Sequence, residues 1–422
     1  MHLLYSIVVA CLGAVSLAGV FSLLLLLAAA KASRPVTRPF VECRPLRLAV
    51  IIPAHDEELL LAATLQSLLA QKYPVNCLEI VVVADNCSDA TAQVGRAAGA
   101  TVLERTSAAE RGKGYALNFA ISHLLARPAP PDGFLIVDAD TWVDPEFLAC
   151  MNARLLAGEA PNGLAAWQAR YGVLNTQDGW RVSLMAGAFD LVNHVKPLGR
   201  EALGLSTGLK GNGMAFSRAV AAQVAWPGCS LTEDLDYGLE LARRYGLRVG
   251  YAPEARVLAQ MPADASQGAS QRARWEEGRA RMARERALPL LGEGLRRRSL
   301  LLWDMGWDLL VPPMAELSGL LFVWIVLIAV GAAAHLLPHS EAWAAAAGLA
   351  VIGLFLYVLG GFRIAGAPRE AYHALLRAPF YALWKFALLL PRATAKISGK
   401  KSEEWVRTAR TPVSPSPKVP RT

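Results

Sequence analysis

Residues 134–140 read Phe134-Leu135-Ile136-Val137-Asp138-Ala139-Asp140, an apolar run that ends in two acids separated by one residue. A short, continuous apolar run that ends at polar residues is typical of a strand buried on both faces. Two similar runs precede it, at Leu48–Ile52 and Ile80–Val83, and acidic residues follow each of them. The repeated pattern predicts several buried strands that each lead into acidic side chains.

Helical patterns separate these predicted strands. Leucines recur at helical spacing over 61–69, Tyr115–Leu125 is a second predicted helix, and Thr101–Leu103 is a further short strand. This alternation of strands and helices predicts an α/β fold, in which a mostly parallel sheet is covered by helices on both faces.

Polar residues follow the predicted strands at their carboxyl ends. They are His55-Asp56-Glu57-Glu58, Asp85 and Asp138-Ala139-Asp140. Because parallel sheets bind ligands beyond the carboxyl ends of their strands, we expect these side chains to share one crevice. The chain has no GxGxxG or GxxxxGK(S/T) loop, which argues against the dinucleotide-binding and P-loop classes.

Three long apolar runs stand apart from this globular pattern. Leu3–Ala30 contains no charged residue, and further runs occupy Met314–Leu337 and Ala342–Phe362. At about 1.5 Å per residue, each is long enough for the ~30 Å hydrocarbon core of a bilayer. We therefore expect three transmembrane helices. A cleaved signal peptide is the alternative for the first run, but the run is too long and no basic residue precedes it.

Basic residues indicate the side of the membrane on which the globular part lies. Lys and Arg follow the first run and precede the second, whereas the link His335–Glu341 has none. Cytoplasmic segments are enriched in Lys and Arg, so we expect a multi-pass inner- or plasma-membrane protein with a cytoplasmic globular domain. The net charge of +8 then belongs to membrane-proximal segments and does not indicate nucleic-acid binding.

The predicted organisation has six parts. They are an N-terminal transmembrane helix (1–30), a cytoplasmic domain (31–299), an interfacial helix (300–313), two transmembrane helices (314–362), a basic loop with an interfacial or re-entrant helix (363–391) and a basic cytoplasmic tail with a disordered end (392–422). The interfacial helix is predicted because Asp304 and Asp308 share one helical face and Trp303 and Trp307 another. A fourth span over Pro379–Leu390 is the alternative for the fifth part.

Two acidic motifs carry candidate chemistry. Asp138 and Asp140 point to the same side of an extended chain and can face one hard cation, although such a pair can also end a strand in a turn. Thr232-Glu233-Asp234 begins an amphipathic helix, where acids also suit the helix N-terminus. The residues alone leave both interpretations of each motif open.

Two basic motifs can bind phosphate. Gln271-Arg272-Ala273-Arg274-Trp275 combines planar guanidinium donors with an indole for stacking, and its alternative is a solvated helix face. Lys113, in Arg111-Gly112-Lys113-Gly114, is a phosphate contact or part of a surface loop.

In this order, the motifs resemble those of family 2 glycosyltransferases, the cellulose-synthase-like, hyaluronan-synthase-like and ceramide-glucosyltransferase-like membrane enzymes. The signature consists of Asp85, Asp138/Asp140, Glu233-Asp234 and Gln271/Arg274/Trp275. The resemblance covers roughly 49–279 and includes Ile52–Glu57, in which Asp56 stands where relatives have Asn. It implies a GT-A (Rossmann-like) catalytic domain beside transmembrane and interfacial helices.

The resemblance also implies a role for each motif. Ala54, Glu57 and Asp85 would hold the nucleoside, with Lys113 nearby; Asp138 would contact the nucleotide and, with Asp140, the metal. Asp234 would be the catalytic base with Glu233 beside it, and Gln271, Arg274 and Trp275 would close over the diphosphate and the acceptor. The implied reaction is inverting transfer of a sugar from a nucleoside-diphosphate donor, with UDP expected, supported by Mg²⁺ or Mn²⁺.

Three interpretations of the function remain open, and they differ in the acceptor or in whether the protein is catalytic. We expect a lipid-linked or polysaccharide acceptor at the cytoplasmic membrane face, with bound membrane lipids. A processive polysaccharide synthase that translocates its product is the first alternative, and a non-catalytic scaffold of a polysaccharide-export assembly is the second. The layout is compatible with homo-oligomers or export partners, and no nucleic-acid partner is expected.

Overall fold

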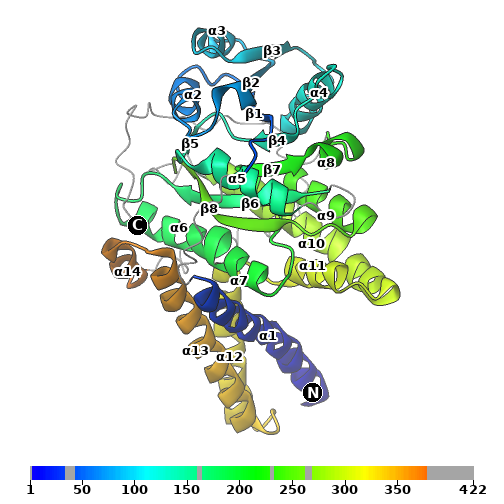
Figure 1. Ribbon diagram of the computed structural model, residues 1–422. Coiled ribbons are helices and arrows are strands. Elements are labelled where there is room, and N and C mark those ends of the chain that lie inside the picture. Colours follow the sequence, from blue (N-terminus) through cyan, green and yellow to red (C-terminus); the bar gives the residue numbers. More distant parts are fainter. Residues whose placement is uncertain (1, 34–42, 159–163, 229–231, 262–268, 378–422) are drawn as a thin grey trace.

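The computed structural model describes residues 2–33, 43–158, 164–228, 232–261 and 269–377. Its globular part is built on an eight-stranded sheet in the order β3-β2-β1-β4-β7-β6-β8-β5 (Figure 1). The strands are β1 (Leu48–Ala54), β2 (Leu78–Asp85), β3 (Thr101–Arg105), β4 (Gly133–Ile136), β5 (Thr141–Val143), β6 (Ala166–Val173), β7 (Met214–Ser217) and β8 (Gly250–Ala259).

Strands β3, β2, β1 and β4 form a parallel half of the sheet, as the apolar runs predicted. β1 lies at its centre, with β2 on one side and β4 on the other. After β1 the chain forms β2 and β3 on one side of β1, and it then crosses over to form β4 on the other side. Such a switch of direction opens a crevice at the carboxyl ends of the strands.

The second half of the sheet mixes directions. β7 runs antiparallel to both β4 and β6, and β5 runs antiparallel to β8, whereas β6 and β8 are parallel. The α/β class and the mostly parallel sheet are confirmed, since parallel pairs outnumber antiparallel ones. The antiparallel direction of β7 could not be predicted from the alternation of strands and helices in the sequence.

Helices cover both faces of the sheet. α2 (Leu61–Leu69), α3 (Thr91–Ala97) and α5 (Phe147–Ala157) lie on one face; α4 (Lys113–Leu125), α8 (Arg218–Gln223) and α9 (Glu233–Tyr245) lie on the other. Successive residues of a strand point to opposite faces, so in β1 Ile51 packs into the core with α4 and Ile52 into the core with α2. Burial on both faces explains why these strands are continuously apolar.

Further helices connect the sheet to an elongated helical part. They are α6 (Trp180–Asp190), a π-helix (Leu191–Val195), α7 (Lys196–Ala202), α10 (Ala269–Arg297), α11 (Leu300–Leu310) and α14 (Arg369–Leu375), and a short 3₁₀ helix (Val75–Cys77) precedes β2. The segment predicted as an interfacial helix (300–313) contains the helix α11, and its location at the membrane interface stays a prediction. Its Asp304 is buried, and Trp303 and Trp307 stack with ring centroids 6.2 Å apart.

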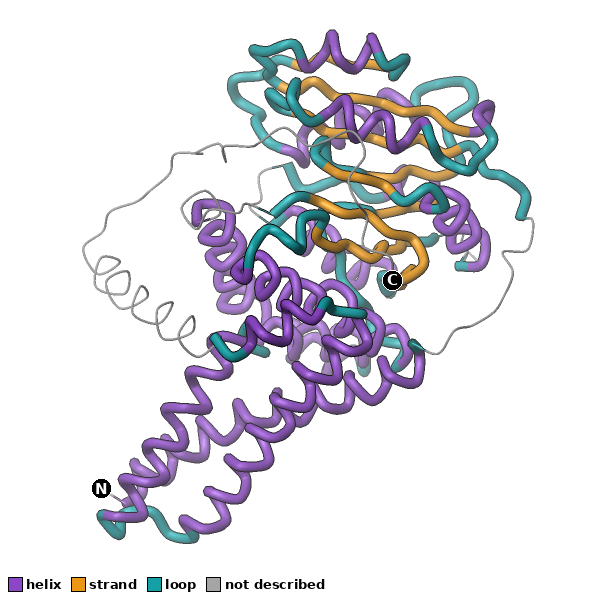
Figure 2. The backbone as a smooth tube through the Cα atoms, turned by 90° about the vertical axis from the view of Figure 1, so that its left-hand side faces the viewer, coloured by secondary structure: helices purple, strands orange, loops and turns teal. Residues whose placement is uncertain are grey.

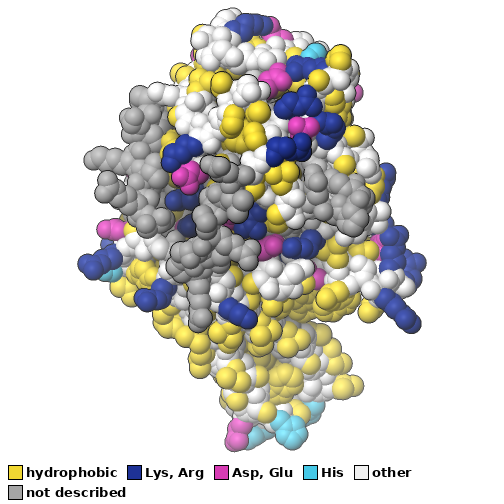
Figure 3. Space-filling model, in the orientation of Figure 1, with side chains coloured by type: hydrophobic (Ala, Val, Ile, Leu, Met, Phe, Trp, Pro, Cys, Tyr) yellow, Lys and Arg dark blue, Asp and Glu magenta, His cyan; other side chains and the backbone are white. Residues whose placement is uncertain are grey.

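α1 (His2–Ala32), α12 (Met314–Ala333) and α13 (Ser340–Ala365) project together from the globular part (Figures 1 and 2). Among the described residues, Glu316–Ala333 and Ser340–Ala365 are long and apolar enough to cross a membrane. Hydrophobic side chains dominate the surface of this projection, and Lys and Arg gather above it (Figure 3). α1 is a continuous helix over the first predicted span. The predicted segment Pro379–Leu390 and the basic tail lie outside the described residues.

Close packing joins α1 to the globular part at Gly199 of α7. A Cβ atom at Gly199 would lie 2.3 Å from the main-chain oxygen of Leu25. We expect Gly199→Ala to push the two helices apart and to lower the free energy of unfolding by about 1–3 kcal/mol, measured by thermal unfolding in detergent. At Gly292 in α10 a Cβ would meet nothing within 4 Å, so Gly292→Ala is the control that retains stability. Equal melting temperatures for Gly199→Ala and wild type would contradict the prediction.

Candidate functional site

Three strands deliver the predicted crevice residues to one edge of the sheet. Ala54 is the last residue of β1, Asp85 is the last of β2, and Asp138 follows β4. β1 is hydrogen-bonded to both β2 and β4, and Ala54 is the register partner of Ala84. The three strand ends therefore lie together, as the strand-end rule predicted.

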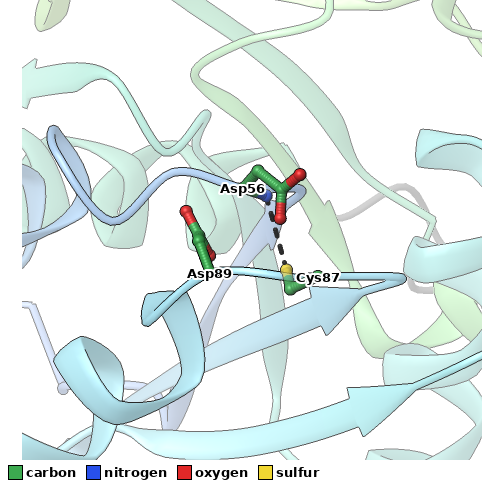
Figure 4. Close-up of side chains that lie close together, drawn as sticks. All are labelled: Asp56, Cys87 and Asp89. Carbon is green, nitrogen blue, oxygen red and sulfur yellow. Dashed lines mark hydrogen bonds between the residues drawn. The ribbon is translucent and has the colours of Figure 1, made fainter.

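The loop after β1 is fixed to the loop after β2. Asp56, whose φ is 54°, accepts a hydrogen bond from the Ser88 amide at 2.6 Å, and its own amide donates to Cys87 Sγ (Figure 4). Asp89 accepts from the Glu58 amide at 3.1 Å. Within the described ranges, Asp56, Cys87 and Asp89 form the one group of three potential metal ligands within 4.8 Å. Since both carboxylates already bind main-chain amides, we assign this group to holding the loops together.

Two predicted nucleoside-binding residues border these loops. The Glu57 amide donates to Thr91 Oγ1 at 2.7 Å, so the residue is fixed against α3. Asp85 is buried and pairs with Arg105 Nη1 at 2.8 Å, and Arg105 in turn pairs with Glu110. Arg105 was not among the residues predicted from the sequence. The available signal was its position at the end of β3, where it is the register partner of Asp85.

Lys113 connects three segments at the centre of the site. Its Nζ lies 2.5 Å from Asp138 Oδ1 and donates to the Gly211 carbonyl at 2.6 Å. Burial alone would lower the pKa of Lys113, but the charges of Asp138, Glu233 and Asp234 outweigh burial and raise that pKa. The predicted phosphate contact is therefore a lysine surrounded by carboxylates.

The Asp138-Ala139-Asp140 segment follows β4 and enters a turn at Ala139 and Asp140, so the chain is not extended there as the sequence predicted. Ala139 is buried and its carbonyl accepts from Thr64, while Asp138 and Asp140 are partly exposed. The Asp138 amide donates to Asn212 Oδ1 at 3.1 Å, which fixes the segment against the loop before β7. Two partly exposed carboxylates supply the oxygen ligands that Mg²⁺ and Mn²⁺ prefer, so the residue types present fit such an ion.

Asp234 lies on the first turn of α9, next to this group. Its Oδ1 accepts a hydrogen bond from the Leu235 amide at 2.9 Å. A Cβ at Gly211 would lie 3.6 Å from Asp234 Oδ2 and 3.9 Å from Lys113 Nζ, so both side chains border the same glycine. Burial, and then the charge of Glu233, raise the pKa of Asp234 to about 6, although Lys113 and Lys210 act in the opposite direction. The carboxylate can accept a proton near neutral pH.

A glycine-rich loop, 208–213, brings these elements together. Gly208, Gly211 and Gly213 all have positive φ, at 70°, 79° and 66°. At Gly213 a Cβ would lie 2.7 Å from the Val257 side chain, so only glycine fits. This loop was not predicted as part of the site, although three glycines in six residues were a signal. It carries Lys210, Gly211 and Asn212, each of which faces a predicted site residue.

Gln271, Arg274 and Trp275 belong to the first two turns of α10. Their side chains lie outside the part of the chain that the structure describes. Their proposed contact with the diphosphate and the acceptor stays a prediction.

Known relatives are similar to part of the chain. The probable glycosyltransferase YdaM of Bacillus subtilis is 23% identical over 257 residues, which are 55% of this chain and 55% of the relative. The 4,4'-diaponeurosporenoate glycosyltransferase of Staphylococcus aureus is 34% identical over 96 residues, which are 22% of this chain and 24% of the relative. The chain thus spans about half of the first curated relative and about a quarter of the second.

Solved structures of glycosyltransferases are also similar. Mannosyltransferase PcManGT from Pyrobaculum calidifontis, in complex with GDP-Man and Mn²⁺, has 21% identity and a TM-score of 0.44, and covers 82% of this chain and 99% of its own. Glucosyl-3-phosphoglycerate synthase from Mycobacterium tuberculosis, in complex with Mn²⁺, UDP and glucosyl-3-phosphoglycerate, has 17% identity and a TM-score of 0.37, and covers 57% of this chain and 80% of its own.

The family model described as glycosyltransferase like family 2 matches residues 45–278. This range contains all four motifs on which the resemblance was based, from Asp85 to Trp275. Because the match covers more than half of the chain, the protein is a member of glycosyltransferase family 2.

Proposed function

We propose that this glycosyltransferase transfers a sugar, with inversion, from a nucleoside-diphosphate donor to a lipid-linked or polysaccharide acceptor at the cytoplasmic membrane face. The observation that carries the proposal is the grouping of Lys113, Asp138 and Asp234 around Gly211. In this group Lys113 pairs with Asp138, and Asp234 is a carboxylate with a raised pKa. UDP is the expected nucleotide.

The donor would bind along the carboxyl ends of β1, β2 and β4. Ala54, Glu57 and Asp85 would hold the nucleoside, and Asp138 and Asp140 would face the diphosphate through Mg²⁺ or Mn²⁺. A bound divalent ion would offset the negative charge that develops on the departing diphosphate. Lys113 supplies a fixed positive charge beside Asp138, which favours the approach of phosphate oxygens.

Asp234 would act as the general base. It takes the proton of the acceptor hydroxyl while the acceptor oxygen forms a bond to the anomeric carbon and the bond to the diphosphate oxygen breaks. One displacement on the side opposite the leaving group inverts the anomeric centre. Glu233 supports this role because its charge raises the pKa of Asp234, which strengthens the base.

The helices α1, α12 and α13 would anchor the enzyme as a multi-pass membrane protein. The length and apolar character of α12 and α13 support this placement. The basic residues on the side of the globular domain support a cytoplasmic catalytic site. In this arrangement the nucleotide sugar arrives from the cytoplasm, and a lipid-linked acceptor arrives from the bilayer.

A donor screen tests the proposed function. The purified full chain, in detergent with added bacterial lipids, is incubated with radiolabelled UDP-glucose, UDP-N-acetylglucosamine, UDP-galactose or GDP-mannose and with Mn²⁺ or Mg²⁺. We expect one donor to release its nucleoside diphosphate and to label a single lipid-soluble product. Release of pyrophosphate, or turnover of no donor at all, would overturn the proposal, and a ladder of products would identify a processive synthase.

A further inference from the structure

Lys210 lies between the proposed base and a second group of charged residues. Its amide donates to Gln168 Oε1 at 2.8 Å, which fixes the main chain of the glycine-rich loop at this point. The next residue, Gly211, borders Asp234 and Lys113. The charges of Lys196, Asp308, Arg279 and Asp234 all act on the Lys210 ammonium group. Lys210 is therefore close to the catalytic crevice and also faces α7 and α11.

The second group joins α7, α10 and α11, and we call it the α7–α11 cluster. It consists of Lys196, Arg200, Arg279, Asp304 and Asp308. Lys196 Nζ lies 2.5 Å from Asp308 Oδ1, and Arg200 pairs with both Asp304 and Asp308. Arg279 donates from Nη2 to the carbonyls of Asp308 and Val311, each at 2.9 Å. The two acids of the cluster are thus already shared by Lys196 and Arg200.

Lys210 adds positive charge to a site that already has a surplus. With Lys210, four cations face the two acids Asp304 and Asp308. Among the residues that the structure describes, no carboxylate lies within ion-pair distance of Lys210 Nζ. Burial, and then the charge of Lys196, lower the pKa of Lys210 to about 8. Lys210 is partly buried, and a partly buried cation without a carboxylate partner costs free energy that an incoming anion would offset.

The position of the α7–α11 cluster indicates where such an anion comes from. α7 packs on α1 through Gly199, and α11 leads through Val311–Pro313 into α12. The cluster therefore lies where the apolar helices meet the crevice, on the route from the bilayer to Asp234. The donor diphosphate is expected on the other side of Gly211, at Lys113, Asp138 and Asp140.

We propose that Lys210 binds an anionic group of the acceptor, a carboxylate or a phosphate, and so places a neighbouring acceptor hydroxyl at Asp234. This inference rests on the proposed function and narrows its acceptor to an amphiphile that bears both a hydroxyl and a negative charge. Lys196 and Arg279 extend the positive surface toward the membrane side, where the apolar part of the acceptor would remain. The hydroxyl loses its proton to Asp234, and the anion itself takes no part in bond formation.

Matched pairs of amphiphiles test the proposal by binding to the full chain in detergent micelles. The first pair is 1-oleoyl lysophosphatidic acid and 1-monooleoylglycerol, which differ in the phosphate, and the second is 12-hydroxystearate and its methyl ester. We expect wild type to bind the anionic member of at least one pair about tenfold more tightly, the size of one charge-assisted hydrogen bond. Lys210→Met should reduce this preference to about twofold or less, whereas Lys210→Arg should retain most of it.

Lys72→Met is the control, because Lys72 is an exposed lysine that pairs with Glu146 and lies away from the site. It should leave the preference for anions unchanged. Equal binding of charged and neutral members by wild type would overturn the proposal, as would an unchanged preference in Lys210→Met. A loss of UDP binding in Lys210→Met without a loss of the preference would also overturn it and assign Lys210 to the diphosphate. Sugar transfer by wild type, measured in the donor screen, reports separately on the proposed function.

Discussion

Asp234→Asn is expected to lower the rate of sugar transfer by about 10²–10⁴, the usual contribution of a general base. The amide has nearly the shape of the carboxylate, and its oxygen can still accept the hydrogen bond from the Leu235 amide. Because Asp234 lies on α9 and the donor is expected at β1, β2 and β4, donor affinity should change only a few-fold. Single-turnover transfer and calorimetric titration with UDP measure the two quantities.

Asp236→Asn provides the matched control for this substitution. Asp236 also lies on the first turn of α9, and no role in the site is assigned to it. It should transfer sugar at the rate of wild type. An equal loss of UDP affinity and of transfer rate in Asp234→Asn would contradict the assignment of Asp234 as the base.

The pKa of Asp234 also predicts how transfer depends on pH. The base must be ionised, so the transfer rate should rise as the pH increases through about 6 and then level off. Folding raises the pKa of Asp234 from 3.8 to about 6, so the stability that this carboxyl contributes below about pH 4 is lost as the pH rises through about 6. At pH 7.5, Asp234→Asn should therefore be more stable than wild type. Its free energy of unfolding should be larger by on the order of 1–3 kcal/mol, and its melting temperature should be higher. A transfer rate that is constant from about pH 5 to 7 would argue against this role.

Asp140→Asn is expected to have the second largest effect, because it removes one of the two carboxylates that fit a divalent ion. Metal-assisted stabilisation of a leaving group contributes several kcal/mol, so transfer should fall by about 10³ or more. Binding of UDP in the presence of Mn²⁺ should weaken about tenfold or more and become insensitive to EDTA. Calorimetric titrations of UDP with Mn²⁺ and with EDTA give both values.

Asp178→Asn serves as the control for Asp140→Asn, since Asp178 is exposed and interacts only locally with Asn175 among the described contacts. It should bind UDP and respond to EDTA as wild type does. Tight, EDTA-sensitive UDP binding by Asp140→Asn would contradict the metal-binding role of Asp140. In that case the pair Asp138/Asp140 would serve to end β4 in a turn, the alternative that the sequence left open.

The parallel half of the sheet could be predicted because its strands are short, continuously apolar runs. Ile51 and Ile52 are consecutive in the sequence but pack into different cores. Burial on both faces of the sheet therefore requires apolar residues at consecutive positions of the strand. The ends of those runs also located Asp85, Asp138 and Asp140, because parallel strands place their carboxyl ends at one edge. Periodicity along the chain therefore predicted the fold class and placed these three proposed site residues at one edge of the sheet.

Other parts of the site depend on contacts between residues far apart in the sequence. Lys113 Nζ reaches the Gly211 carbonyl across 98 positions, and Arg105 meets Asp85 only because β3 lies beside β2. β7, which runs antiparallel to both neighbours, begins directly after Gly213, a glycine with positive φ. The periodicity of residues along the chain does not predict which main-chain group, remote in the sequence, a lysine side chain will contact.

The sequence by itself determined the α/β class, the apolar helices and the ordered motifs of family 2, since each is a local pattern of burial or of residue types. Only the tertiary structure decided that Lys113 joins Asp138 to the glycine-rich loop, that Asp234 is buried enough to raise its pKa, and that Lys210 faces the α7–α11 cluster. The physical reason is that electrostatic energies depend on distance and burial, and both are set when remote segments pack together.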